Sequence, residues 1–441
     1  MRAPQSTRKS TTTRRTAKPR RRAKSSPMVP AARPARAVRS RWPEGVAVKV
    51  WHRYFGSEFG VEEVQALAEV LQQEFLTNGP QTQAFQEEFA AFCHVPHAFA
   101  TSSCTTALAL AAQVCGLVEG DEVVTTPLTF VSTHQAFMAC GAVPVFADVD
   151  PRTFNVDPVS VAARVTSRTR AIFVTHLNGQ CCDMDAINGI ARTHDLRVVE
   201  DAAHVVGATY KGRPSGSLGD AAAFSFHSSK NMTTLGEGGM LTTRNPEWAA
   251  KVPPLRSMGV NYGLDEPRPD PRDYWLPLPY EVDDPDGYIP DNYRMSEAQA
   301  AVGRVQLRKV PRLNARRRAI AHRYTEALRH LPGIVTPYES AEGIHVYYLY
   351  SILVDDTQVR FARDDLMRVL FRDFGVHTIT GYPPAYWFKM YRKRGYERGL
   401  CPVAERIYRQ MIMLPLYARM SDNDVDYVIE SIAAAVGKLA S

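Results

Sequence analysis

The chain has 441 residues, of which 45% are hydrophobic, so it is long enough to bury a large core and to form two domains. It contains no apolar run of about 18 residues, which excludes a transmembrane helix. The net charge of +7 is misleading, because residues 1–43 carry 14 Lys and Arg and no acidic residue. The rest of the chain has a net charge of −7, which gives no support to nucleic-acid binding by the folded part.

Residues 1–45 are predicted to form a disordered basic tail, because they are rich in Arg, Ser, Thr and Pro and lack apolar periodicity. Four interpretations remain open: an organellar transit peptide, a basic arm on an anionic surface, an over-extended start with Met28 as true initiator, or a solubilising tail. No secretory signal is present. The seven cysteines are scattered without zinc-ligand spacing, so we expect a cytoplasmic protein with reduced thiols.

Between residues 78 and 201, short β-branched runs alternate with amphipathic helical patterns. The predicted strands are residues 98–101, 122–125, 144–147, 171–175 and 197–200. The predicted helices are residues 83–92, 105–114, 131–139 and 187–194, with another near Val159. This alternation predicts an α/β fold with parallel strands joined by right-handed helical crossovers.

The second half of the chain has a different pattern. Residues 262–291 are polar and rich in Pro and Asp, which predicts a long loop that is either a lid or a domain connector. A helical stretch follows Ser296 and includes residues 317–331, after which come a strand at 346–354 and two further helical regions. We therefore predict a large domain of residues 46–296 and a smaller α+β domain of residues 297–441.

Polar clusters follow three of the predicted strands, at residues 101–106, 129–133 and 201–204. Ligands of parallel α/β sheets bind outside the carboxyl ends of the strands. The clusters therefore predict a single active site. The hydroxyls of residues 101–106 open a helix, where they either accompany a bound phosphate or simply cap the helix.

Asp201 and His204 follow a buried strand. A carboxylate such as Asp201 pairs with a protonated pyridine nitrogen and keeps the ring positive, and His204 is placed to hydrogen-bond a phenolic oxygen of the same ring. The alternative for Asp201 is a helix N-cap. Phe130, beside Pro127 and Thr129, is either a stacking face for a planar cofactor or a core residue.

The most informative segment is residues 225–239, where Lys230 stands between hydroxyl-bearing residues and a glycine-rich turn. A lysine in a pocket that favours its neutral amine attacks a carbonyl and forms a Schiff base. Ser225 is placed to hold a phosphate. This combination is what a pyridoxal phosphate (PLP) site requires. The alternative is a surface lysine in a Ser/Thr-rich loop.

These motifs occur in the order and spacing of a known family: the chain resembles the DegT/StrS-type sugar aminotransferases, a branch of the fold-type-I PLP enzymes. The resemblance runs from residue 78 to residues 414–417. Its most specific parts are residues 200–204, 225–239 and 291–297. It implies a mixed, mostly parallel seven-stranded sheet in the large domain, with a smaller α+β domain that supplies the outer wall of the pocket, including residues 381–384.

The resemblance also implies residue roles. Lys230 is the Schiff-base lysine and proton carrier, Asp201 the pyridine-nitrogen partner, His204 the phenolic-oxygen partner and Phe130 the stacking ring. The phosphate ligands are Thr105, Thr106, Ser225 and, from a second subunit, Asn292. An active homodimer with shared sites follows from the last of these.

The implied reaction moves an amino group from glutamate or glutamine to a keto-sugar. His227 resembles members that use nucleotide-linked sugars, whereas Gln is typical of members that act on cyclitol ketones. A cyclitol aminotransferase and a PLP-dependent dehydratase stay open as alternatives, although Lys230 argues against the dehydratase. A non-enzymatic regulator that binds nucleic acid through the basic tail is the alternative from another class.

Two residues depart from the family pattern. Cys104 stands where the family has Gly, which would strain the backbone if that position required a positive φ. Leu235 looks like an insertion between Thr234 and Gly236 that reshapes the glycine turn behind Lys230. The 262–291 loop is also longer than usual and is a place where substrate preference is expected.

Overall fold

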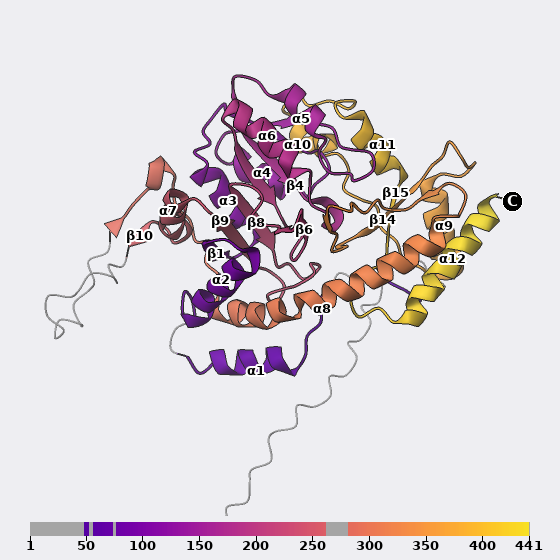
Figure 1. Ribbon diagram of the computed structural model, residues 1–441, viewed down its shortest axis with the longest axis horizontal. Helices are drawn as coiled ribbons and strands as arrows, with labels where there is room; N and C mark the ends of the chain where they lie inside the picture. The colour runs from indigo at the N-terminus through magenta and orange to yellow at the C-terminus, as the bar shows by residue number, and fades with distance from the viewer. Residues whose placement is uncertain (1–47, 53–55, 74–75, 262–280, 441) are drawn as a thin grey trace, which may run out of the picture. The chain divides into compact units, whose positions relative to one another are not determined.

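The computed structural model describes residues 48–52, 56–73, 76–261 and 281–440 (Figure 1). The predicted basic tail and residues 262–280 of the predicted loop lie outside the described residues. Residues 46–441 group as one unit by their contacts. The division of this unit into domains at residues 296 and 297 stays a prediction.

The fold is organised around a seven-stranded sheet with the strand order β1-β9-β8-β5-β4-β2-β3. Its strands are β1 (His97–Thr101), β2 (Glu122–Thr125), β3 (Val143–Phe146), β4 (Thr169–Thr175), β5 (Arg197–Asp201), β8 (Ala221–Ser225) and β9 (Gly239–Thr243). Only β9 runs against the others, pairing antiparallel with both β1 and β8. The mixed, mostly parallel sheet is thus confirmed.

Helices cover both faces of the sheet (Figure 1). Alternate residues of the strands therefore pack into two different apolar cores, one on each face. Val198 belongs to one core and its neighbour Val199 to the other. The helices of this region are α2 (Pro80–Cys93), α3 (Cys104–Val114), α4 (Ser132–Met138), α5 (Pro158–Arg164), α6 (Met184–His194) and α7 (Pro246–Arg256). The predicted strands and helices agree with these elements to within a few residues.

The long helix α8 (Glu297–Leu328) connects this sheet to the C-terminal elements. It begins with a capping box between Ser296 and Gln299. The buried carboxylate of Glu297 accepts hydrogen bonds from the backbone N–H groups of Gly79, Gln81 and Thr82 at the start of α2. Glu297, the first residue of α8, thereby accepts hydrogen bonds from N–H groups at the start of α2 that have no partner within that helix.

The C-terminal part builds a further core on a three-stranded antiparallel sheet. Its strands are β12 (Ile334–Val335), β14 (Tyr350–Val354) and β15 (Met411–Leu414), and its helices are α9 (Arg363–Phe374), α10 (Lys389–Arg392), α11 (Pro402–Gln410) and α12 (Asp422–Ala440). Smaller elements are α1 (Val61–Val70), β6 (Thr209–Tyr210), β7 (Arg213–Pro214), β10 (Val260–Asn261), β11 (Glu281–Val282) and β13 (Gly343–Ile344). None of the described helices is long and apolar enough to cross a membrane.

The structure departs from the predicted elements at two places. The strand predicted at residues 346–354 begins only at Tyr350, because Tyr347 has a φ of 46° and the N–H of Val346 bonds the carbonyl of Gly179 instead of a strand. The predicted 262–291 loop includes strand β11, which pairs antiparallel with β10. Alternation of residue types does not reveal either feature, since both depend on contacts with distant parts of the chain.

Candidate active site

A cavity of about 370 Å³ opens at the carboxyl ends of β4, β5 and β8. Six of the predicted site residues line it: Thr105, Phe130, Asp201, His204, Ser225 and Lys230. Thr106 and Asn292 do not line it. A larger cavity, of about 560 Å³, lies between residues 150–159 and 338–344, and none of the predicted site residues contributes to it. The smaller cavity is therefore the candidate active site.

Residues 103–105, at the start of α3, line one end of this cavity. Ser103 and Thr106 form a reciprocal capping box, in which the Thr106 N–H donates to Ser103 Oγ at 3.2 Å and the Ser103 N–H donates to Thr106 Oγ1 at 3.1 Å. Thr105 is exposed. Cys104 is the first residue of α3, so its backbone is right-handed and the strain considered for this position does not arise.

Asp201 ends β5 and is held from two sides. Its Oδ2 accepts a hydrogen bond from Thr133 Oγ1 at 2.6 Å, and its Oδ1 accepts one from the Ala203 N–H at 3.1 Å. Burial raises the pKa of Asp201, and the hydrogen bond from Thr133 opposes that effect. No helix begins after Asp201, because the next element is β6, so the alternative of a helix cap is wrong.

A pyridine ring with a phenolic oxygen fits the remaining surfaces of the cavity. The Nδ1 of His204 is buried and has no hydrogen-bond partner among the described residues. Burial, together with the charge of Lys230, holds the pKa of His204 well below its usual value, so this imidazole is neutral. Phe130 is 57% exposed and lines the cavity with Ala203, which leaves an aromatic face free to stack.

Lys230 is buried, with only 9% of its surface exposed. Among the described residues, no carboxylate forms an ion pair with its amine. Its loop is tied to the glycine turn by hydrogen bonds from the Phe226 N–H to the Gly238 carbonyl and from the Ser228 N–H to the Gly236 carbonyl. A Cβ on Gly238 would lie 2.0 Å from Thr234 Oγ1, so only glycine fits there. Backbone hydrogen bonds and close packing thus join this turn to the loop that carries Lys230.

Leu235 is the strained point of this turn, with a φ of 66° and a side chain that is 43% exposed. A left-handed conformation costs a residue with a Cβ about 1–2 kcal/mol. We expect Leu235→Gly to raise the free energy of unfolding by about 1 kcal/mol, measured by urea denaturation. The matched control is Gly236→Ala, which places a Cβ at a φ of 113° and is expected to destabilise the protein. A loss of stability in Leu235→Gly would contradict this assignment of strain.

Three residues that the sequence analysis did not select as site residues also line the cavity: His227, Tyr348 and Tyr382. The ring of Tyr348 lies against that of His204, with centroids 4.1 Å apart, and the Lys230 Nζ lies 4.3 Å from the centroid of the same tyrosine. Tyr382 belongs to the predicted outer wall at residues 381–384. The sequence analysis missed Tyr348 because it interpreted residues 346–349 as part of a strand. The contacts of Tyr348 with His204 and Lys230 join distant parts of the chain, so the sequence pattern does not reveal them.

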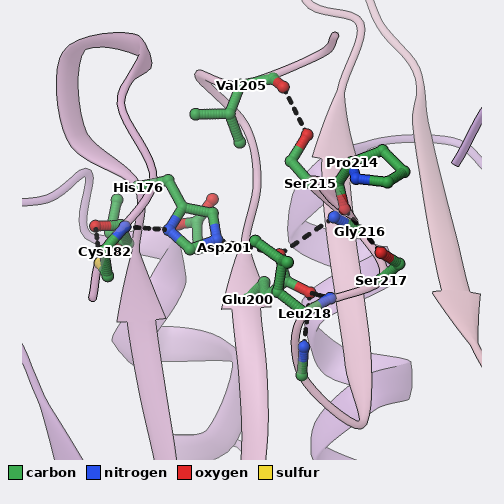
Figure 2. Close-up of polar contacts among 12 residues, drawn as sticks. His176, Cys182, Glu200, Asp201, Val205, Pro214, Ser215, Gly216, Ser217 and Leu218 are labelled. Atoms are coloured by element: carbon green, nitrogen blue, oxygen red, sulfur yellow. Dashed lines mark hydrogen bonds and ion pairs between the residues drawn. The ribbon is translucent and has the colours of Figure 1, made fainter. Parts of the chain in front are cut away.

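Behind Asp201 lies a buried polar network, shown in Figure 2. The Glu200 carboxylate accepts hydrogen bonds from the N–H groups of Gly216, Leu218 and Gly219 and lies 2.9 Å from His176 Nε2. The Cys182 N–H donates to His176 Nδ1 at 3.1 Å, so the imidazole proton is on Nε2 and points at Glu200. This network joins the ends of β4 and β5 to the turn that precedes β8.

The geometry agrees with comparisons to known proteins. The model of the DegT/DnrJ/EryC1/StrS aminotransferase family matches residues 58–433. The chain is 43% identical over 374 residues to the spore coat polysaccharide biosynthesis protein SpsC of Bacillus subtilis, covering 85% of this chain and 94% of SpsC. It is 38% identical over 350 residues to the GDP-perosamine synthase of Caulobacter vibrioides, covering 79% of this chain and 88% of that synthase.

Solved structures are similar as well. The aminotransferase TlmJ from Streptoalloteichus hindustanus superimposes with a TM-score of 0.79 at 33% identity, covering 88% of this chain and all of TlmJ (100%). Sequence and fold agree along nearly the whole folded part. The chain therefore belongs to the DegT/DnrJ/EryC1/StrS aminotransferase family and is a PLP-dependent aminotransferase.

Proposed function

We propose that this enzyme moves an amino group from glutamate or glutamine to the ketone of a nucleotide-linked sugar, in amino-sugar biosynthesis. The observation that carries the proposal is the position of Lys230 in the same cavity as Asp201, His204 and Phe130. The similarity to a GDP-perosamine synthase and to a polysaccharide biosynthesis protein supports a sugar as acceptor. His227 at the rim of the cavity supports the nucleotide-linked form.

The proposal gives each side chain a role. Lys230 would hold the cofactor covalently and carry a proton on Nζ, while Asp201 would keep the ring nitrogen protonated and His204 would bond the ring oxygen. Phe130 would stack on the ring. Such a cofactor would withdraw electrons from the carbon that bears the amine and make its proton acidic. Thr105 and Ser225, which line the cavity, would bind the phosphate together with the free N–H groups of α3, and the third assigned ligand, Thr106, caps that helix outside the cavity lining.

The Lys230 role is tested by reducing the loaded protein with borohydride and mapping the adduct by mass spectrometry. We expect the adduct on Lys230. A protein that takes up no PLP would contradict the proposal. Glutamate and glutamine are then compared as donors by the change in visible absorbance. Keto-sugar nucleotides and cyclitol ketones are compared as acceptors, and turnover of cyclitols alone would favour the alternative acceptor. A dehydrated product without amine would favour the dehydratase.

Asn292 is assigned to the active site of a second subunit, which makes the homodimer necessary for activity. Asn292 is exposed and its N–H bonds the carboxylate of Asp291 at 2.6 Å. We expect Asn292→Asp to weaken PLP binding at least about tenfold, because a carboxylate repels the phosphate. Binding is measured by fluorescence titration of the protein freed of cofactor.

A complementation experiment tests the sharing directly. Mixed dimers of Lys230→Ala and Asn292→Asp contain one site with both defects and one site with neither. At a PLP concentration too low to load Asn292→Asp, neither variant is active on its own, and we therefore expect activity to reappear when the two are unfolded and refolded together. If the mixture stays as inactive as its components, Asn292 does not act in the partner's site.

The regulatory alternative concerns the basic tail. Deleting residues 1–43 removes 14 positive charges. An enzyme keeps its amine transfer after this deletion, whereas a nucleic-acid-binding regulator loses a salt-dependent affinity. We expect the truncated protein to transfer amine at the rate of the full chain.

A further inference from the structure

A chain of hydroxyl and imidazole groups leads from Lys230 to the surface. The Lys230 Nζ lies over the ring of Tyr348, whose Oη is 3.2 Å from Ser229 Oγ. Ser229 Oγ is in turn 2.9 Å from His227 Nδ1. Lys230 is only 9% exposed, whereas the His227 side chain is 44% exposed. The side chains of Tyr348, Ser229 and His227 therefore lead from the buried amine of Lys230 to solvent.

The hydrogen bonds of this chain all point outward. The Ser229 backbone N–H donates to His227 Nδ1 at 3.2 Å, so Nδ1 is an acceptor and the imidazole proton is on Nε2. Ser229 Oγ therefore donates to Nδ1, and its oxygen accepts the proton of Tyr348 Oη. The outer nitrogen, Nε2, faces the exposed carboxylate of Glu237 at 3.9 Å.

We propose that Tyr348, Ser229 and His227 form a proton relay between the Lys230 amine and solvent. The proposal rests on the proposed function of Lys230. A donor amino acid arrives as an ammonium ion and must lose a proton before its nitrogen can attack. A proton that reaches Lys230 passes to Tyr348 Oη as the phenol proton passes to Ser229 Oγ. The serine proton passes to His227 Nδ1, and the Nε2 proton leaves to water. Each N–H or O–H bond broken is replaced by one formed, and the reverse sequence returns the proton.

The surrounding charges favour this route. Burial by itself would raise the pKa of Tyr348, but the charges of Lys230 and Arg317 outweigh that effect and lower it. Tyr382, the other phenol of the cavity, has a pKa raised well above its usual value by burial and by Tyr348, so it keeps its proton. The charge of the Asp201 carboxylate also raises the pKa of Tyr382, and this carboxylate accepts a hydrogen bond from Thr133 Oγ1.

The two other histidines near the relay are poor proton carriers. Burial holds the pKa of His204 well below its usual value. It lowers the pKa of His52, which lines an adjoining cavity of about 210 Å³ together with His227, to about 4. His227 is thus the half-exposed imidazole through which a proton can leave.

The relay is tested on the PLP-loaded enzyme without substrate, by a rapid change of pH followed through the visible absorbance of the cofactor. We expect His227→Ala and Tyr348→Phe to slow this relaxation about tenfold or more. Free imidazole should restore the rate in His227→Ala and leave Tyr348→Phe slow. Ser229→Ala is a second variant that interrupts the same path.

Tyr350→Phe is the matched control. Tyr350 lies in β14, its Oη is 2.8 Å from Thr325 Oγ1, and it does not line the cavity. This variant should relax at the rate of the unmodified enzyme. An unchanged relaxation in His227→Ala, or a slow one that imidazole does not restore, would overturn the relay. Failure of the unmodified protein to load PLP on Lys230 would instead contradict the proposed function.

Discussion

Replacing Lys230 by alanine is expected to abolish the covalent PLP adduct and to lower the rate of amine transfer by about 10⁴-fold. The reason is that the proposed function assigns both cofactor binding and proton transfer to this one side chain, and no other lysine among the described residues lines the cavity. The rate is measured in single turnover with glutamate, and the adduct by mass spectrometry after reduction.

The matched control is Lys211→Ala. Lys211 is 42% exposed and pairs with Asp185 on the surface at 2.9 Å. This variant should keep both the adduct and the rate. If Lys230→Ala still forms a reducible adduct and transfers amine at a comparable rate, Lys230 is not the cofactor lysine. PLP bound without a covalent link in Lys230→Ala would agree with the prediction, because the phosphate and ring contacts remain.

The second large effect is expected on stability. Glu200→Ala removes the acceptor of three backbone N–H groups and of His176. His176, Gly216 and Leu218 are buried, and Gly219 is partly buried. We expect the free energy of unfolding to fall by about 3–5 kcal/mol, as measured by urea denaturation. The control is Glu88→Ala, whose carboxylate bonds the half-exposed Arg304 and should contribute about 1 kcal/mol or less. Equal effects in the two variants would contradict the role given to Glu200.

The same carboxylate predicts a pH dependence. Burial opposes ionisation of Glu200, but the hydrogen bonds from His176 and the backbone outweigh burial and lower its pKa from the usual 4.5. A carboxyl group with a lowered pKa in the folded state stabilises the fold above its unfolded pKa, and this contribution is lost as the pH falls through the folded pKa. The unmodified protein should therefore lose stability below about pH 4.5 more steeply than Glu200→Gln.

Local patterns in the sequence predicted most elements of the large sheet. The strand at Glu122–Thr125 was predicted with its observed bounds, and α2 and α6 to within three residues. These elements are regular, and their apolar residues repeat with the period of a strand or helix. The alternation of strands and helices also predicted which strand ends would meet, since parallel strands bring their carboxyl ends to one edge.

The errors share a physical cause. The backbone of residues 346–349 bonds residues 178 and 179, far away in the sequence, and Tyr347 is left-handed. A run of apolar residues around Tyr348 looks like a strand, but these contacts turn it into a loop that faces the site. Leu235 was recognised as unusual, but its positive φ depends on how the turn is bonded to Phe226 and Ser228.

The sequence by itself predicted the fold class, the cofactor and the candidate residues, because the motifs around Lys230, Asp201 and His204 occur in the order and spacing of a known family. Only the tertiary structure decided which hydroxyls cap α3, what holds Asp201, and that Tyr348 lies between Lys230 and Ser229. Local periodicity is encoded by neighbouring residues. The hydrogen bonds Thr133–Asp201 and Ser229–Tyr348 join residues 68 and 119 positions apart, so they depend on how the whole chain packs.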